Sequence, residues 1–243
     1  MFLFFALIAF LTASFVQFII IFLLILIHEL GHFLTASVLR IELDKIYIYP
    51  FGGISMFNIE LNERLEKELL ILVLGPLSQF LFALVLERLL FFNHYSKIIE
   101  IYNYTILGFN LLPIYPLDGG KLINILLSYI SSFKRSLNIT LIISYIAITI
   151  IGIKLLLSDF SLSIIMIICF LIYKVNIEWK NKKYLNDKFL LERYLHNYSF
   201  KKRKYVSSTN DMMRNKYHLF KIDGKYHTER EVLFNKFKNK YWL

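Results

Sequence analysis

The chain has 243 residues, of which 57% are hydrophobic, and its mean hydropathy of +0.54 excludes an ordinary soluble domain. Its net charge of +10 is unevenly distributed: residues 174–243 contain 18 Lys and Arg against 7 Asp and Glu, whereas residues 1–173 contain 10 against 11. We therefore predict a nearly neutral transmembrane core at residues 1–178 and a basic cytoplasmic tail at residues 179–243.

The first apolar stretches predict membrane helices near the start of the chain. Residues 2–13 are apolar but short for a full crossing, which takes about 20 residues. They lack a charged segment in front and a small-residue cleavage site behind, so we interpret them as a retained span and not as a signal peptide. A second span is predicted at residues 16–39 and ends at Arg40.

This second span contains the sequence HELGH at residues 28–32. His28 and His32 are four residues apart, so on a helix they share one face and can bind the same metal ion. Glu29 follows the first histidine and can take a proton from a water molecule that the metal activates. The alternative is a pair of buried histidines that hydrogen-bond to neighbouring helices. We favour the metal site, because ionisable groups at membrane depth are costly and are functional by default.

Residues 41–59 differ in character from the spans around them. Alternating and β-branched residues with Pro50 and Gly52-Gly53 predict two short strands around a turn. Such a hairpin beside a membrane site can present a strand edge to an extended peptide. An interfacial loop is the open alternative.

A third span, at residues 69–92, carries the sequence GPLSQ at residues 75–79. It places a small residue, a helix breaker and an amide at membrane depth. Non-ideal backbone is tolerated there where it is buried in protein, and a simple packing kink is the alternative.

A fourth span, at about residues 98–112, runs into NLLPIYPLDGG at residues 110–120. The two prolines end the helix, and the two glycines permit close backbone approach after it. Asp118 is then an acidic residue between apolar stretches, which is costly unless a positive group pairs with it. Because catalytic zinc typically takes three protein ligands, we expect Asp118 to be the third ligand. The competing interpretation is an N-cap for the helix that starts near Gly119.

Apolar runs at residues 137–157 and 160–173 bring the predicted spans to six. Basic residues concentrate in the loops after the second and fourth spans and in the tail, which places both termini in the cytoplasm by the positive-inside rule. The predicted fold is an all-α membrane protein, a bundle of six transmembrane helices with a short membrane-associated β-hairpin and a small cytoplasmic tail.

The tail is expected to open with a helix at residues 184–198, followed by the basic cluster at residues 201–204. We expect this cluster to contact anionic lipid. No nucleic-acid partner is expected, because no recognised binding motif accompanies the charge. His196, His218 and His227 show no metal-ligand spacing and are expected at the surface.

The motifs HELGH, PFGG (residues 50–53), GPLSQ and NLLPIYPLDGGK (residues 110–121) together resemble the site-2 protease family of intramembrane metalloproteases. The likeness covers about residues 16–200, and FLLERYL at residues 189–195 points to the sporulation branch of that family.

The resemblance implies one zinc ion per chain, bound by His28, His32 and Asp118, with Glu29 as the general base. It also implies a substrate-contacting or polarising role for Asn110.

By the same resemblance, the substrate is a membrane-associated precursor of the mother-cell sigma factor sigma-K (pro-sigma-K), cleaved in the mother-cell membrane around the forespore and subject to inhibitory membrane partners. A helical substrate must unwind before cleavage, and the hairpin around Phe51, Gly52 and Gly53 is our candidate for holding the unwound segment. Longer members of this branch append a CBS nucleotide-binding domain, whereas a shorter stretch follows residue 195 here, so ATP sensing is not expected. The alternative function is a non-catalytic membrane metal-binding or scaffold protein whose basic tail binds lipid or a partner.

Overall fold

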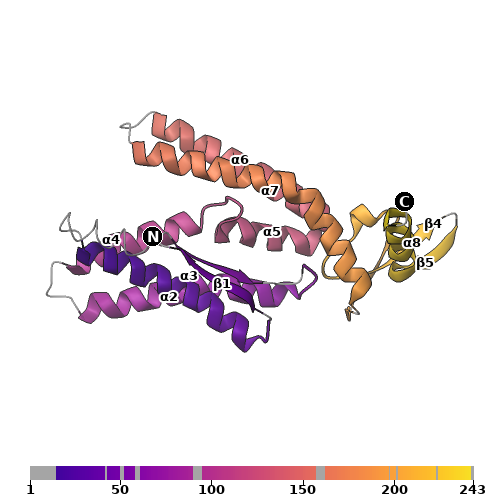
Figure 1. The fold of residues 1–243 in the computed structure, drawn as a ribbon, viewed down its shortest axis with the longest axis horizontal. Coiled ribbons are helices and arrows are strands. Elements are labelled where there is room, and N and C mark those ends of the chain that lie inside the picture. Colours follow the sequence, from indigo (N-terminus) through magenta and orange to yellow (C-terminus); the bar gives the residue numbers. More distant parts are fainter. Residues whose placement is uncertain are drawn as a thin grey trace. The chain divides into compact units, whose positions relative to one another are not determined.

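The computed structural model describes most of the chain and divides it into two compact units. Unit 1 comprises Met1–Ile59 and Lys67–Leu111, and unit 2 comprises Glu60–Glu66 and Leu112–Leu243. The described residues form seven α-helices, one short 3-10 helix and five strands (Figure 1). They are residues 15–41, 43–49, 52–57, 61–89, 95–156, 162–196, 198–200, 202–222 and 224–241.

The described part of unit 1 consists of three helices and a hairpin. Helix α2 (Phe15–Val38), most of α3 (Leu65–Leu89) and α4 (Tyr95–Asn110) enclose an apolar cluster of Ile20, Leu24, Ala83 and Ile99. Strands β1 (Leu43–Tyr49) and β2 (Gly52–Phe57) pair antiparallel, with Tyr49 opposite Gly52, and β2 packs against α2. The predicted pair of strands is thus confirmed. Pro50 and Phe51 lie outside the described residues.

Three helices are long and apolar enough to cross a membrane, within the part of the chain that the structure describes. They are Phe15–Val38, Leu65–Leu89 and Phe133–Lys154. The predicted first span, residues 2–13, lies outside the described residues, and α4 has only 16 residues. The six-span arrangement therefore stays a prediction, whereas its helical, multi-pass character is confirmed.

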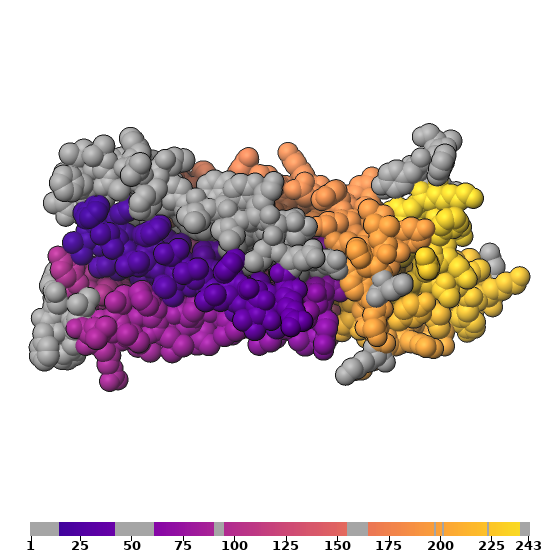
Figure 2. Space-filling view, turned by 60° about the horizontal axis from the view of Figure 1, so that its bottom comes forward, coloured from indigo at the N-terminus to yellow at the C-terminus, as the bar shows by residue number. Residues whose placement is uncertain are grey.

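Large apolar side chains also cover the outward faces of the unit 1 helices. On α2, Leu34 and Val38 are 59% and 80% exposed, and on α3, Leu81 and Val85 are 54% and 57% exposed. Figure 2 shows the surface of these helices in indigo to magenta. A soluble protein would bury such a face, so these helices are built for a lipid environment.

Unit 2 begins with an antiparallel helical pair, α5 (Asp118–Ile130) and α6 (Phe133–Leu156). Helix α6 then runs alongside α7 (Leu162–Leu195) (Figure 1). Helix α7 has 34 residues and is continuous through residues 178 and 179, where we predicted the core to end. The helix expected at residues 184–198 is its last part.

The rest of the tail folds as a small module, which we call the terminal module (residues 202–241). It contains β3 (Arg203–Val206), the 3-10 helix η1 (Thr209–Asp211), β4 (Tyr217–Ile222), β5 (Lys225–Thr228) and α8 (Glu229–Tyr241). The sheet order is β3-β4-β5, with β3 parallel and β5 antiparallel to β4. The all-α prediction was therefore incomplete, because it missed this sheet.

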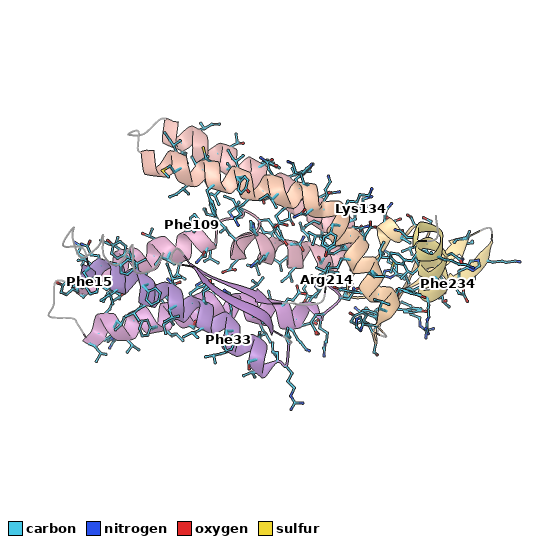
Figure 3. The ribbon with its side chains drawn as sticks, viewed as in Figure 1. Phe15, Phe33, Phe109, Lys134, Arg214 and Phe234 are labelled. Atoms are coloured by element: carbon cyan, nitrogen blue, oxygen red, sulfur yellow. The ribbon has the colours of Figure 1, made fainter. Side chains whose placement is uncertain are left out.

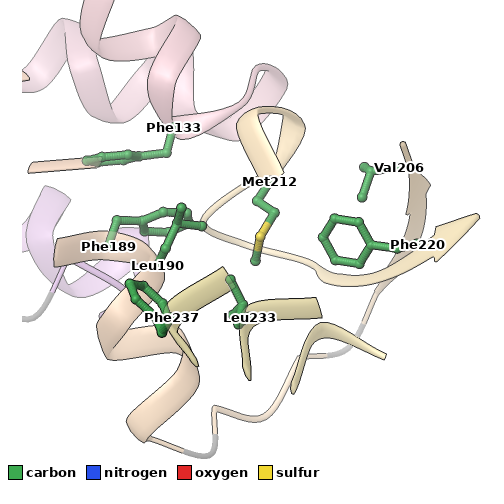
Figure 4. Close-up of a cluster of buried hydrophobic side chains, with 8 residues drawn as sticks. All are labelled: Phe133, Phe189, Leu190, Val206, Met212, Phe220, Leu233 and Phe237. Atoms are coloured by element: carbon green, nitrogen blue, oxygen red, sulfur yellow. The ribbon is translucent and has the colours of Figure 1, made fainter. Parts of the chain in front are cut away.

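An apolar core joins the terminal module to the ends of α6 and α7 (Figure 4). The rings of Phe133 and Phe189 stack with their centroids 4.5 Å apart. The module contributes the other side of this core through the buried side chains Val206, Met212, Phe220, Leu233 and Phe237. The tail is therefore a packed extension of unit 2.

Buried polar groups add to this junction. Arg193 on α7 donates from Nη2 to the Met213 carbonyl at 2.7 Å, and burial lowers its pKa to about 10. His218 is fully buried: its Nδ1 contacts Glu229 at 2.7 Å, and its Nε2 accepts from the Met213 N–H at 3.0 Å. The prediction that His218 lies at the surface was wrong, because both ring nitrogens have partners inside the module.

Two further contacts tie the terminal module to distant parts of unit 2. Arg214, labelled in Figure 3, donates from Nε to the Leu61 carbonyl at 2.6 Å. Lys134, at the start of α6, donates from Nζ to Asn210 at 3.1 Å (Figure 3). The module thus holds both the segment before α3 and the turn between α5 and α6.

Candidate metal centre

The two histidines of the HELGH sequence lie one turn apart on α2 and point to the same side. Both are buried, His28 at 2% and His32 at 5% exposure. Their Nε2 atoms are 3.1 Å apart. The spacing of four residues therefore brings the two nitrogens together as the sequence predicted.

The other ring nitrogen of each histidine faces a hydrogen-bond acceptor on α3. His32 Nδ1 lies 2.8 Å from the carbonyl oxygen of Ile71, and His28 Nδ1 lies 2.9 Å from Oε1 of Gln79. A carbonyl can only accept, so His32 must carry its proton on Nδ1. In its neutral form this ring then presents a lone pair at Nε2.

The orientation of the Gln79 amide is set by Asn103 on α4. Gln79 Nε2 donates to Asn103 Oδ1 at 3.0 Å and to the Asn103 carbonyl at 3.3 Å. Because the NH2 group of Gln79 faces these acceptors, its Oε1 must face His28 and accept the Nδ1 proton. Gln79 and Asn103 are 0% and 1% exposed. Such outer partners fix the tautomer and orientation of a metal-ligating histidine.

Small residues allow α3 to approach the histidines this closely. A Cβ atom added to Gly75 would have three ring atoms of His32 within 2.6 Å. On α2, a Cβ atom added to Gly31 would lie within 2.9 Å of Ser78 atoms and the Leu74 carbonyl oxygen. Gly75 is followed by Pro76, which has no N–H to continue the helical ladder. The GPLSQ sequence is therefore the surface against which the histidine helix packs, and not only a kink.

The hydrogen bonds of the two rings test whether this pair suits a metal ion. When both rings are neutral and carry their proton on Nδ1, two Nε2 lone pairs face one another across 3.1 Å, and these lone pairs repel unless a cation lies between them. Two nitrogens bound to one tetrahedral zinc ion at about 2.0–2.1 Å are about 3.3 Å apart. The residues present therefore fit zinc.

The remaining predicted residues of unit 1 lie at the following places. Glu29 is half-buried on α2, one residue after His28. Asn110 is the half-buried last residue of α4. Gly52 and Gly53 begin β2, opposite Tyr49 and Ile48 of β1.

Asp118 belongs to unit 2, where it is the first residue of α5. The N-cap position is Leu117, which has no side-chain cap, so the interpretation of Asp118 as an N-cap is wrong. Its largely buried carboxylate lies 3.8 Å from Lys121 Nζ. The assignment of Asp118 as the third ligand beside His28 and His32 therefore stays a prediction. Two imidazoles and one carboxylate are a ligand set typical of catalytic zinc, which keeps a fourth position for water.

Sequence reasoning missed the role of two residues at this centre. It noted Gln79 only as an amide at membrane depth and did not consider Asn103. The available signal was polarity, because both residues interrupt apolar helices. Their pairing was not visible, because they lie 24 residues apart on different helices.

Comparison with known proteins agrees with this centre. The model of the family "Peptidase family M50" matches residues 16–95, which include both histidines and the GPLSQ sequence. Stage IV sporulation protein FB of Bacillus subtilis (strain 168) is 32% identical over 177 residues, covering 71% of this chain and 62% of that protein. The zinc metalloprotease MJ0392 of Methanocaldococcus jannaschii is 34% identical over 135 residues, covering 51% of this chain and 39% of that protein.

A solved structure is also similar. The site-2 protease from Methanocaldococcus jannaschii aligns with a TM-score of 0.57 at 26% identity, covering 73% of this chain and 87% of that one. The chain spans less than two thirds of the length of the two curated relatives.

Proposed function

Because the chain belongs to the site-2 protease family, within peptidase family M50, we propose that it is an intramembrane zinc metalloendopeptidase. The observation that carries the proposal is the buried pair of histidine Nε2 atoms 3.1 Å apart, with each Nδ1 held by a separate acceptor. We propose that His28, His32 and Asp118 hold one zinc ion per chain.

Zinc, when bound, supplies a Lewis acid that lowers the pKa of a water molecule and polarises a peptide carbonyl. Glu29, next to His28 on α2, would take a proton from the water that attacks the carbonyl carbon and would return it to the leaving amine nitrogen. Gln79 and Ile71 hold the two imidazoles in the tautomer that presents Nε2 to the ion.

Substrate binding is assigned to the hairpin and to the end of α4. An unwound peptide carries free N–H and C=O groups, and a strand edge can pair with them. In this proposal Phe51, Gly52 and Gly53 hold the unwound segment, and Asn110 contacts it from the end of α4.

The proposed substrate is a membrane-associated protein precursor, and pro-sigma-K is our specific candidate. What supports it is the similarity to stage IV sporulation protein FB and the FLLERYL sequence at the end of α7. The cellular site would then be the mother-cell membrane around the forespore, where inhibitory membrane proteins can regulate the enzyme. We further propose six spans, both termini in the cytoplasm, and anionic lipid beside the basic tail.

Co-expression with a membrane-tethered pro-sigma-K tests this function. The wild-type chain is expected to release a shortened product, and Glu29→Gln is expected to release none while still retaining zinc. Equal processing by both chains would remove Glu29 from the mechanism. A wild-type chain that retains zinc but cleaves no tethered precursor would favour the non-catalytic metal-binding alternative.

Metal analysis tests the third ligand separately. Asp118→Asn removes the negative charge but keeps the size of the side chain, so it is expected to weaken zinc retention in purified protein. Unchanged zinc content after dialysis against a chelator would exclude Asp118 from the ligand set.

A further inference from the structure

A line of buried polar side chains runs between α5 and α6 in unit 2. On α5 it contains Asn124 and Ser128, and on α6 it contains Ser136, Thr140 and Ser144. The members on each helix are four residues apart, so each set lies on one face. The three residues on α6 are 0% exposed, in a helix that is long and apolar enough to span the membrane. Buried polar groups in such a setting require partners.

Two pairs of these polar side chains contact each other directly across the two helices. The Ser128 and Ser136 hydroxyls lie 3.1 Å apart, and Asn124 Nδ2 donates to Thr140 Oγ1 at 3.3 Å. One further turn toward the start of α5, Gly120 is the position that corresponds to Ser144 on α6. At this third pair of positions α6 has a hydroxyl group, whereas α5 has no side chain.

The backbone of the preceding loop takes the place of that missing side chain. A Cβ atom added to Gly120 would lie within 2.6 Å of the Ile114 carbonyl group and the Tyr115 nitrogen. The Tyr115 N–H donates to Ser144 Oγ at 2.8 Å. Ser144 Oγ itself donates to the Thr140 carbonyl at 2.8 Å, so its hydrogen is already used and a lone pair faces the loop.

This contact fixes the segment that leads directly into Asp118. Only two residues, Pro116 and Leu117, separate Tyr115 from the carboxylate-bearing residue. The Leu117 N–H donates to the Ile114 carbonyl at 2.8 Å, so the segment between them is itself a closed turn. Holding Tyr115 therefore holds the start of α5.

We propose that Ser144 is a positioning residue that fixes the 112–117 loop and thereby aims the Asp118 carboxylate at zinc. The inference rests on the proposed function, since it assigns Asp118 to the metal. Ser144 touches neither the metal nor the substrate in this role. Its effect is on the geometry of one ligand, and partners of this kind typically change metal affinity by about 10-fold to 100-fold.

The test measures zinc affinity of the purified full chain by competition with a chelator. Ser144→Ala is expected to weaken zinc binding by about 10-fold or more. Ser136→Ala is the matched control, because it removes an equally buried hydroxyl from the same helix face but leaves the loop contact intact. Ser144→Thr keeps the oxygen and is expected to retain affinity close to that of the wild type.

A double variant separates positioning from general damage. In the Asp118→Asn background the ligand is already lost, so adding Ser144→Ala is expected to change zinc affinity little further. Equal losses from Ser144→Ala in both backgrounds, or equal losses from Ser144→Ala and Ser136→Ala, would overturn the proposal. If Ser144→Ala does not fold, Ser144→Cys takes its place in the test, because a thiol has a similar size but is a weak acceptor. Wild-type zinc affinity in Ser144→Cys would also overturn the proposal. A wild-type chain that binds no zinc would instead contradict the proposed function.

Discussion

The hydrogen bond between Gln79 and His28 gives the sharpest test of the metal centre. Gln79→Leu removes both ends of the amide while nearly keeping its volume, so little cavity is left. The His28 Nδ1–H loses its acceptor at 2.9 Å, and Asn103 Oδ1 loses its donor at 3.0 Å. Each buried group left without a partner costs about 1–3 kcal/mol. Zinc binding is affected because the His28 imidazole loses the partner that fixes its orientation and tautomer. We expect the affinity for zinc to fall by about 10-fold to 100-fold, equivalent to about 1.4–2.7 kcal/mol.

The assay is chelator competition on purified protein, with Gln79→Glu and Thr105→Val as companions. Gln79→Glu keeps an acceptor for the His28 Nδ1–H, so it is expected to bind zinc more tightly than Gln79→Leu. Thr105 lies exposed on the same helix as Asn103 and bonds only within its own helix among the contacts of the described chain, so Thr105→Val is expected to bind like the wild type. Wild-type affinity in Gln79→Leu would refute the assignment of Gln79 as the outer partner.

Three other changes probe separate parts of the structure. Gly75→Ala should abolish zinc retention, because the added methyl overlaps the adjacent imidazole, and normal zinc content would show that α3 can move away. Arg214→Leu removes the donor to the Leu61 carbonyl and should lower stability by about 1–3 kcal/mol, seen as a lower melting temperature, whereas Arg230→Leu on the exposed face of α8 should not. Burial raises the pKa of Glu178 above 4.5, so its contribution to stability is present below pH 4.5 and is lost as the pH rises through the raised value. Glu178→Gln should therefore melt higher than the wild type near neutral pH and lose that part of the pH dependence; identical melting curves at every pH would contradict this.

The parts of the fold that follow from local pattern were predictable from the sequence. The second span, predicted at residues 16–39, forms a helix at Phe15–Val38, and the run predicted at 137–157 forms one at Phe133–Leu156. Long apolar runs specify helices because the backbone has no other way to satisfy its hydrogen bonds in lipid. The hairpin followed from alternation and turn residues at 50–53. The histidine pair followed from helical spacing alone.

The terminal module was not predictable in the same way. Its strands have only four to six residues, and their exposed positions carry the Lys and Arg that made the segment read as a solvated basic tail. The core that organises it includes Phe133 and Phe189, which lie on helices far earlier in the chain. His218 has no metal-ligand spacing and looked like a surface residue, yet the fold surrounds it with Glu229 and the Met213 N–H. Long-range packing of this kind leaves no periodic signal in the sequence.

The polar network of unit 1 distinguishes a metal site from a structural one. In a purely structural hydrogen-bond network at membrane depth, every donor faces an acceptor, because a buried polar group without a complementary partner costs free energy. Here the chain from Asn103 through Gln79 to His28 is matched at every step, and so is the contact from His32 to Ile71. These two sets of hydrogen bonds leave the Nε2 atoms of His28 and His32 facing each other, each as an acceptor. Between two neutral imidazoles this arrangement is unfavourable, whereas around a cation it is favourable, so the outer hydrogen bonds support the proposal that this pair of histidines binds a metal ion.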